Sequence, residues 1–217
     1  MSGPTAYDTS VVIPLPHDDH IRTILGDDYN PGRALNVVKM FAGTDDMCDA
    51  TLGLVRAVFA AEGIDPKLRQ AIILRAATIL NVPYEWQANV PMSLNNGLTH
   101  AEIDVIGTRD SAVPDAYALV CTATDELSRE GTLTDATLQR LRDEHGDTGA
   151  RKLVLMIAWF NLLSLFLNGC RVPMETTDKI GDGVDAPRRH RCARVEVLIT
   201  TEGGVRVRGY HDRAGYR

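Results

Sequence analysis

The chain has few cysteines, and no two of them form a close pair. They are Cys48, Cys121, Cys170 and Cys192, and their spacings match neither a Cys-x-x-Cys motif nor a zinc site. Cys48 and Cys121 lie among apolar residues in helical patterns, where a cysteine usually acts as a small buried hydrophobic side chain. The sequence therefore argues against chemistry by a neighbouring pair of thiols and against a cysteine-based metal centre.

Long apolar runs are also scarce. The longest, from Leu153 to Leu167, is interrupted by Asn161 and Ser164 and is too short to span a bilayer comfortably. No opening stretch joins a basic start to an apolar run, so we expect no signal peptide. These absences predict a cytoplasmic protein with no membrane partner.

Over most of the sequence, basic residues are fewer than acidic ones. The 217 residues carry a formal net charge of −6, but residues 187–217 hold eight arginines against three acidic residues, so this tail is +5 and the remainder is −11. An acidic body repels phosphate backbones, so we expect no nucleic-acid partner for the folded part. A hydrophobic content of 44% and a charged content of 24% are ordinary for a globular protein.

Helical patterns occupy the middle of the chain. Residues 1–32 lack sustained periodicity and contain four prolines, which indicates an N-terminal arm on the surface or on a neighbouring subunit. Residues 33–176 are expected to form the helical domain. Helix starts are predicted at Asp65-Pro66, at Pro83 and at Thr99, where Glu102 completes a capping box. Later helices are predicted over residues 114–130, 134–145 and 148–168, the last one closed by a glycine at position 169.

Residues 177–217 form an Arg-rich C-terminal extension. Within it, residues 195–201 and 205–208 alternate between apolar and polar side chains around Gly203-Gly204, a pattern typical of a β-hairpin. An isolated hairpin is marginal in water, so the extension is expected to be either a hairpin packed on another surface or a disordered tail.

The most specific signal is the segment Pro83-Tyr-Glu-Trp-Gln-Ala-Asn-Val-Pro-Met92. It resembles the site helix of the carboxymuconolactone decarboxylase / AhpD-like family. In the peroxidase branch of that family the helix opens with Cys-x-x-Cys and a histidine four residues on, whereas the decarboxylase-like branch reads Tyr-Glu-Trp-x-x-His. Here the two cysteine positions are Val82 and Glu85, and the histidine position is Asn89. The resemblance is therefore to the decarboxylase-like branch, without the thiols of the peroxidase branch.

The resemblance extends from about Arg33 to Glu175. Residues 64–70 resemble a helix start of the family, in which glutamate is usual at the position of Gln70. Residues 153–175 resemble the closing helix and its Val-Pro-x-Glu exit. The resemblance implies an all-α AhpD-like helical bundle in which an antiparallel helix hairpin carries the site. It also implies a homo-oligomer, as a dimer, trimer or hexamer, which agrees with the many-sided apolar content of the closing helix.

The resemblance implies that Gln70, Glu85 and Asn89 form the catalytic site of this protein. Glu85 and Asn89 stand four residues apart and share a helix face. Glu85 is the only ionisable member, because amides do not titrate near neutrality. Enclosure by apolar neighbours would raise its pKa toward the range useful for general acid–base catalysis, and the two amides could hold a substrate carbonyl. The alternative for Glu85 is a carboxylate that faces water near a helix N-terminus.

Five further residues are candidates for binding a small-molecule substrate: Tyr84, Trp86, Met92, Trp159 and Asn161. Trp86 is expected to form a pocket wall, although a tryptophan is more often a packing residue. Asn161 lies in an apolar run, so it either lines the pocket or bonds across a helix interface. His17-Asp-Asp-His20 offers metal-ligand chemistry, but it is local and has no second cluster, so no metal and no cofactor are expected.

These observations favour a cofactor-free lyase or isomerase that decarboxylates, dehydrates or cyclises a small carbonyl or lactone compound through acid–base catalysis by Glu85. One alternative is an AhpD-type peroxidase or disulfide reductase, which requires a thiolate pair that the motif lacks. The other is a non-catalytic scaffold or binding protein that kept the fold and lost the proton relay.

Overall fold

The computed structural model describes residues 4–5, 7, 10–27, 29–108, 113–177, 179, 195–199 and 205–209. The chain divides into two compact units, residues 1–182 and 183–217. Among the described residues, the first unit is built from helices alone and the second contains two strands. The boundary between the units lies six residues beyond the predicted end of the helical domain.

Eight α-helices and one 3₁₀ turn form the described part of the first unit. In chain order they are α1 (Asp18–Leu25), α2 (Asn36–Ala42), η1 (Asp45–Met47), α3 (Cys48–Phe59), α4 (Pro66–Ile79), α5 (Pro83–Asn95), α6 (His100–Ile106), α7 (Asp115–Glu130) and α8 (Asp135–Cys170). The predicted all-α class of this unit is confirmed.

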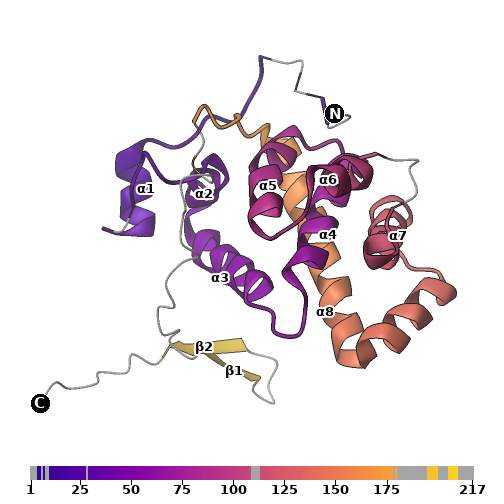
Figure 1. The fold of residues 1–217 in the computed structure, drawn as a ribbon. Coiled ribbons are helices and arrows are strands. Elements are labelled where there is room, and N and C mark those ends of the chain that lie inside the picture. Colours follow the sequence, from indigo (N-terminus) through magenta and orange to yellow (C-terminus); the bar gives the residue numbers. More distant parts are fainter. Residues whose placement is uncertain are drawn as a thin grey trace, which may run out of the picture. The chain divides into compact units, whose positions relative to one another are not determined.

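Helix α4 is the centre of this unit (Figure 1). It packs against α5, α6, α7 and α8, and every residue from Arg69 to Thr78 is buried. The helix starts where the sequence predicts, because Asp65 accepts a hydrogen bond from the backbone N–H of Lys67 and Pro66 occupies the first turn. A helix with no exposed side in its middle must satisfy its polar side chains inside the protein.

The buried charge of Arg75 on α4 is paired. The guanidinium of Arg75 forms two hydrogen bonds of 2.6 Å to the Asp125 carboxylate of α7. It also donates to the carbonyl oxygens of Ile106 and Thr108, just where α6 ends. The two-bond ion pair with Asp125, the strongest form of the arginine–carboxylate contact, joins α4 to α7. The bonds to the two carbonyl oxygens join the same side chain to the end of α6.

The pair α4 and α5 forms the helix hairpin that was expected to carry the site. Only three residues separate the two helices, and Asn81 among them adopts a left-handed conformation with φ 53°. Pro83 occupies the first turn of α5. The capping box at the start of α6 is present, with reciprocal bonds between Thr99 and Glu102.

The last helices agree with their prediction except at the C-terminal end. The label α8 covers two helical stretches that meet at a kink at Gly146, where φ is 66°, so the predicted division between residues 134–145 and 148–168 is confirmed. The helix does not stop before Gly169 but continues through Cys170, and the left-handed residue after it is Arg171, with φ 53°. A glycine at the end of a helical pattern was therefore not its cap.

The predicted N-terminal arm contains a helix that periodicity did not reveal. Ile21 of α1 is fully buried in a cluster with Phe41 of α2 and Cys48 of α3. Helix α2 was also not predicted. Both helices are about two turns long, and such short elements depend on tertiary packing rather than on their own pattern.

The second unit contains β1 (Val195–Ile199) and β2 (Val205–Gly209), which pair antiparallel with Val197 opposite Val207. The predicted β-hairpin strands are thus present, while the turn between them lies outside the described residues.

By length and composition alone, α8 could cross a membrane. An 18-residue window has mean hydropathy 1.9, and 39% of this window is buried inside the unit. Within the described ranges it is the one helix that passes this test. A core helix of a globular protein passes it too, and the expectation of no membrane partner stays a prediction.

We predict that Asp125→Ala lowers the free energy of unfolding by about 3 kcal/mol, because it leaves the buried Arg75 charge without its carboxylate. Urea denaturation followed by circular dichroism measures the loss. The matched control is Glu144→Ala, which removes an exposed carboxylate from its pair with Arg140 and should cost less than about 1 kcal/mol. Equal losses in the two variants would refute a special role for the Asp125 pair.

Candidate active site

Glu85 is a buried carboxylate with an incomplete set of partners. It lies in the first turn of α5, and its side chain is 1% exposed. The Ser164 hydroxyl of α8 donates to Oε2 at 2.5 Å, whereas Oε1 has no hydrogen-bond partner. The alternative in which Glu85 faces water near a helix N-terminus is therefore wrong.

Burial sets the protonation state of this group. It raises the pKa of Glu85 from 4.5 to about 8, and the hydrogen bond from Ser164 opposes part of that rise. A carboxyl group with this pKa is mostly protonated at neutral pH, so it can donate a proton. It also lies close enough to neutrality to take the proton back.

The two amides form a separate hydrogen-bonded group. Ser93 Oγ lies 3.1 Å from Gln70 Oε1 and 2.7 Å from the carbonyl oxygen of Asn89, so it links α4 to α5. Asn89 donates its amide to the carbonyl oxygen of Glu85, one turn back along the helix, at 2.9 Å. Gln70 is fully buried, and its Nε2 has no partner. The carboxyl of Glu85 makes no hydrogen bond to either amide side chain.

Tyr84 and Trp86 flank Glu85 in the sequence but make packing contacts with other elements. The Tyr84 hydroxyl donates to the Glu175 carboxylate at 2.6 Å and accepts from the Val37 N–H at 3.0 Å, and burial raises its pKa. Trp86 lies against Gly107 so closely that a Cβ on Gly107 would be 2.2 Å from Cη2 of the indole. The substrate-binding roles of both residues remain predictions.

The other three candidates for substrate binding occupy different surroundings. Trp159 is 4% exposed in the main core cluster, and its indole N–H has no partner. Asn161 donates to the carbonyl oxygen of Ile157 on its own helix, and Met92 is half-buried on α5. Of these three, only Trp159 presents a free polar atom to the interior.

Ser164 and Ser93 are site residues that the sequence analysis did not select. Both are fully buried hydroxyls, and each bonds to a predicted site residue. A signal for Ser164 existed, because it interrupts the longest apolar run of the chain. Ser93 has no comparable signal, since a serine near a helix end is common.

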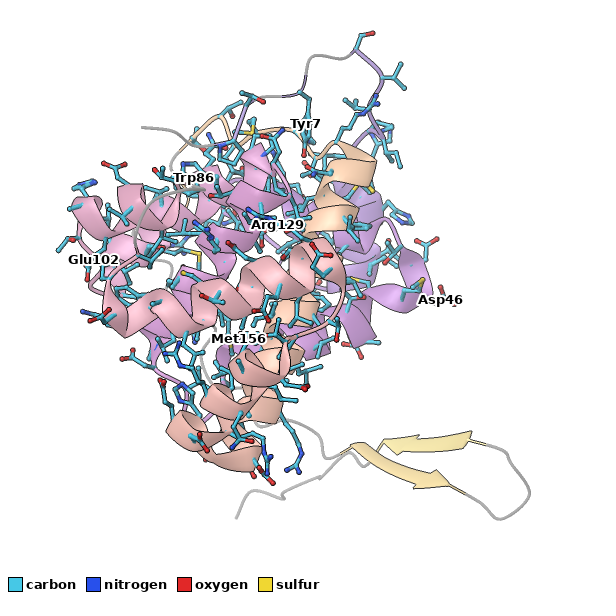
Figure 2. The ribbon with its side chains drawn as sticks, turned by 90° about the vertical axis from the view of Figure 1, so that its right-hand side faces the viewer. Tyr7, Asp46, Trp86, Glu102, Arg129 and Met156 are labelled. Atoms are coloured by element: carbon cyan, nitrogen blue, oxygen red, sulfur yellow. The ribbon has the colours of Figure 1, made fainter. Side chains whose placement is uncertain are left out.

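Tyr7 comes to the same region from the N-terminal arm. Its hydroxyl donates to Asn168 Oδ1 at 2.7 Å, one turn beyond Ser164 on α8, and Figure 2 shows it beside the last turns of that helix. Burial and the nearby charge of Glu85 raise the pKa of Tyr7 to about 12. The arm is also held by bonds from the Thr5 N–H to Asn81 and from the Ile13 N–H to the Cys170 carbonyl oxygen. The described part of the arm thus lies against the C-terminal end of α8, and Tyr7 is near enough to Glu85 for its charge to affect the pKa of Tyr7.

A cleft of about 310 Å³ opens on another side of α5. Its lining consists of Gln87, Ala88, Pro91, Glu175, Thr176, Thr177 and Lys179. Glu175 is held there by Tyr84 and by an ion pair of 2.7 Å with Lys179. None of the three predicted catalytic residues lines this cleft.

The remaining candidates for chemistry are not assembled into a site. His20 pairs with Asp45 at 2.8 Å, and the described residues contain no group of three or more potential metal ligands. Cys48 and Cys121 are buried, and burial raises the pKa of Cys121 to about 12. Burial also raises the pKa of Cys170, and Cys192 lies outside the described residues.

Comparison with known proteins confirms the family resemblance and the fold. Residues 45–137 match the family model of the Carboxymuconolactone decarboxylase family. A solved AhpD-core structure, an uncharacterised peroxidase-related protein from Ralstonia eutropha JMP134, is 18% identical. The match has a TM-score of 0.63 and covers 77% of this chain and 93% of that one.

A second solved structure is a protein of unknown function from Agrobacterium tumefaciens, whose description suggests an antioxidant defence protein AhpD. It is 20% identical, with a TM-score of 0.56, and the match covers 63% of this chain and 97% of that one. At these identities the likeness concerns the fold. No curated protein matches the sequence.

We predict that Glu85→Gln stabilises the protein increasingly as pH rises from 5 to 8. In this window, between the ordinary pKa of 4.5 and the folded value of about 8, the carboxyl is ionised when unfolded and protonated when folded. Folding then takes up a proton, so the free energy of unfolding falls with rising pH, by up to about 1.4 kcal/mol per pH unit. Urea denaturation of both proteins at several pH values measures the difference, with the exposed Glu144→Gln as control. A pH-independent difference would contradict the assignment.

We also predict that Ser164→Ala raises the pKa of Glu85 further, because the variant removes the hydrogen bond that favours the ionised carboxylate. A pH titration of the side-chain carboxyl carbon by ¹³C NMR reads the pKa directly. The control is Ser93→Ala, which removes a buried hydroxyl that bonds to Gln70 rather than to Glu85. A Glu85 pKa that is unchanged or lower in Ser164→Ala would show that the hydroxyl does not stabilise the charge.

Proposed function

We infer that the chain, whose residues 45–137 belong to the carboxymuconolactone decarboxylase family, is a cofactor-independent lyase or isomerase. It would act on a small carbonyl or lactone compound, with Glu85 as the general acid–base. We propose further that it works in the cytoplasm.

One observation carries this proposal, namely the unpaired Oε1 of Glu85. A buried carboxyl oxygen without a partner is costly, and native proteins keep few such groups. Among the described residues, the carboxyl of Glu85 has the uncharged Ser164 as its hydrogen-bond partner, and burial is the main cause of its raised pKa. Perturbed acids of this kind cluster at functional sites, where the pKa is matched to proton transfer near neutral pH.

For a decarboxylation, the proton balance is simple. The substrate loses CO₂ from a carboxylate that is β to a carbonyl, and the electron pair of the broken C–C bond remains as an enolate. Protonated Glu85 gives its proton to the enolate carbon, and the Glu85 carboxylate regains a proton from solvent. An isomerisation uses the same group in both directions, because a pKa of about 8 lets it accept as well as donate.

The two amides have different parts in this proposal. Gln70 Nε2 is a buried donor without a partner, so it can hold the substrate carbonyl oxygen on which the enolate charge develops. Asn89 already donates to the Glu85 carbonyl oxygen, so it positions the first turn of α5 rather than binding substrate.

Substrate needs a way in, because Glu85 is enclosed in the present arrangement. The described residues that precede α1 could leave while α1 stays packed against α2 and α3. They are held by bonds of Thr5 to Asn81, of Tyr7 to Asn168, of the Ile13 N–H to the Cys170 carbonyl oxygen and of Arg171 to the Val11 carbonyl oxygen. We propose that the arm swings away from the end of α8 to admit substrate.

A non-catalytic scaffold is the second candidate, and the enclosure of Glu85 favours it. Two of the three site positions are amides, and the described cleft lies elsewhere on α5. The AhpD-type peroxidase is less favoured. It needs a reactive thiolate, and the pKa of each of the three described cysteines is raised, which disfavours the thiolate.

The test is deuterium exchange at carbon. We predict that the protein in D₂O exchanges the protons next to the carbonyl in a panel of small ketones, lactones and β-keto acids, and releases CO₂ from the β-keto acids that it accepts. Glu85→Gln should lower both rates by about a hundredfold or more, since it removes the acid–base group. NMR of the panel measures exchange.

Glu144→Gln, an exposed change on α8, is the control and should keep the full rate. Tyr7→Ala should raise the rate, because it loosens the arm over the site. A folded wild-type protein that exchanges none of the panel, with and without Tyr7→Ala, would favour the scaffold.

A further inference from the structure

The cleft beside α5 has one wall from that helix and one wall from the segment that follows α8. Gln87, Ala88 and Pro91 belong to the first wall, and residues 175–177 and 179 belong to the second. The volume of about 310 Å³ is at the lower end of the range for small-molecule sites. At about 30 Å³ for each water-sized group, the cleft can take a compound of about ten non-hydrogen atoms.

The two walls are joined by hydrogen bonds. The Gln87 side chain bonds twice to the backbone of Glu175: its Nε2 donates to the carbonyl oxygen at 3.1 Å, and its Oε1 accepts from the N–H at 3.0 Å. The carboxylate oxygen Oε1 of Glu175 accepts from the Tyr84 hydroxyl and from the Asn36 N–H, each at 2.6 Å. A cleft fixed in this way loses little conformational freedom when a ligand binds.

The second wall contains a buried ion pair with unused hydrogen-bonding groups. The Glu175 and Lys179 side chains are 6% and 11% exposed, and Nζ lies 2.7 Å from Oε2. The two atoms are close, but their angle is not that of a hydrogen bond, and Oε2 has no hydrogen-bond donor among the described residues. Lys179 donates to the Ala34 carbonyl oxygen at 3.0 Å, whereas an ammonium carries three N–H groups. A buried carboxylate oxygen without a donor is costly, which indicates a partner that supplies one.

The first wall offers an acceptor. Pro91 lies inside α5 and has no N–H, so the carbonyl oxygen of Gln87, four residues earlier, lacks its usual helical donor. Both residues line the cleft. The proline therefore weakens the helix and leaves a hydrogen-bond acceptor at the cleft wall.

We propose that this cleft binds a small uncharged primary amide. Its two N–H groups donate to Oε2 of Glu175 and to the Gln87 carbonyl oxygen. Its oxygen accepts from the Lys179 ammonium, and its hydrocarbon part lies on Ala88 and Pro91. A primary amide carries two donors and one acceptor oxygen, which is the set that the two walls lack.

Charge selects against ionised ligands. Glu175 and Lys179 already neutralise each other. A carboxylate ligand places a second negative charge beside Glu175, and an ammonium ligand places a second positive charge beside Lys179. The chain up to residue 186 also carries −11, which opposes the approach of anions.

The proposal does not depend on the catalytic role of Glu85, so binding rather than turnover tests it. Three probes of equal size are butyramide, butyrate, which replaces the amide by a carboxylate, and 2-pentanone, which keeps the carbonyl but has no donor. Titration of the full ¹⁵N-labelled chain, followed by ¹H–¹⁵N NMR, gives each Kd. Butyramide should shift the backbone signals of the lining residues with a Kd on the order of millimolar. Butyrate and 2-pentanone should bind at least about tenfold more weakly.

Pro91→Ala is the variant that unfolding cannot explain. It restores an N–H to α5, which bonds to the Gln87 carbonyl oxygen and stabilises the helix. Butyramide should then bind about fivefold more weakly, although the protein is more stable. The matched control is Pro66→Ala, in the exposed first turn of α4, which should bind butyramide like the wild type. Lys179→Met removes the donor to the amide oxygen and should weaken binding by about tenfold.

Three results would overturn the proposal. In the first, butyramide moves no signal of the lining residues, or it moves only signals around Glu85, which belong to the proposed active site. In the second, Pro91→Ala and Lys179→Met both bind butyramide like the wild type. In the third, butyrate or 2-pentanone binds as tightly as butyramide, because the class of ligand is then wrong.

Discussion

The burial of α4 from Arg69 to Thr78 is the constraint on which the rest of the helical unit depends. Because α4 is enclosed along its middle, its polar side chains need partners from the helices around it. Arg75 takes Asp125 from α7 and two carbonyl oxygens from the end of α6, and Gln70 takes Ser93 from α5. These bonds fix how the neighbouring helices are placed, whereas apolar contacts alone would tolerate small shifts.

The same close packing around α4 and α5 also produces the candidate site at Glu85. The first turn of α5 packs against α4 and the last turns of α8, so the Glu85 side chain is buried. Ser164 is the hydrogen-bond partner of its carboxyl. The surroundings that make the carboxyl a neutral acid also enclose it. Chemistry at Glu85 and movement of the N-terminal arm are therefore two parts of one hypothesis.

The two faces of α8 have different surroundings. The Ser164 hydroxyl is fully buried and donates to the Glu85 carboxyl, while Leu162 and Leu165 on the same helix are exposed.

The sequence by itself determined the helical class and the hairpin of α4 and α5, and it selected Glu85 as the candidate acid–base residue. Those features rest on local signals: the Asp65-Pro66 start, the capping box at Thr99, and the family-like segment from residue 83 to 92. Only the tertiary structure decided that α1 and α2 form, that α8 continues through Gly169, and that Ser164 and Tyr7 reach the carboxyl's surroundings. The physical reason is that short helices and buried hydrogen bonds draw their stability from residues far away in the chain, here 79 positions from Glu85 to Ser164, and no local pattern records such a distant partner.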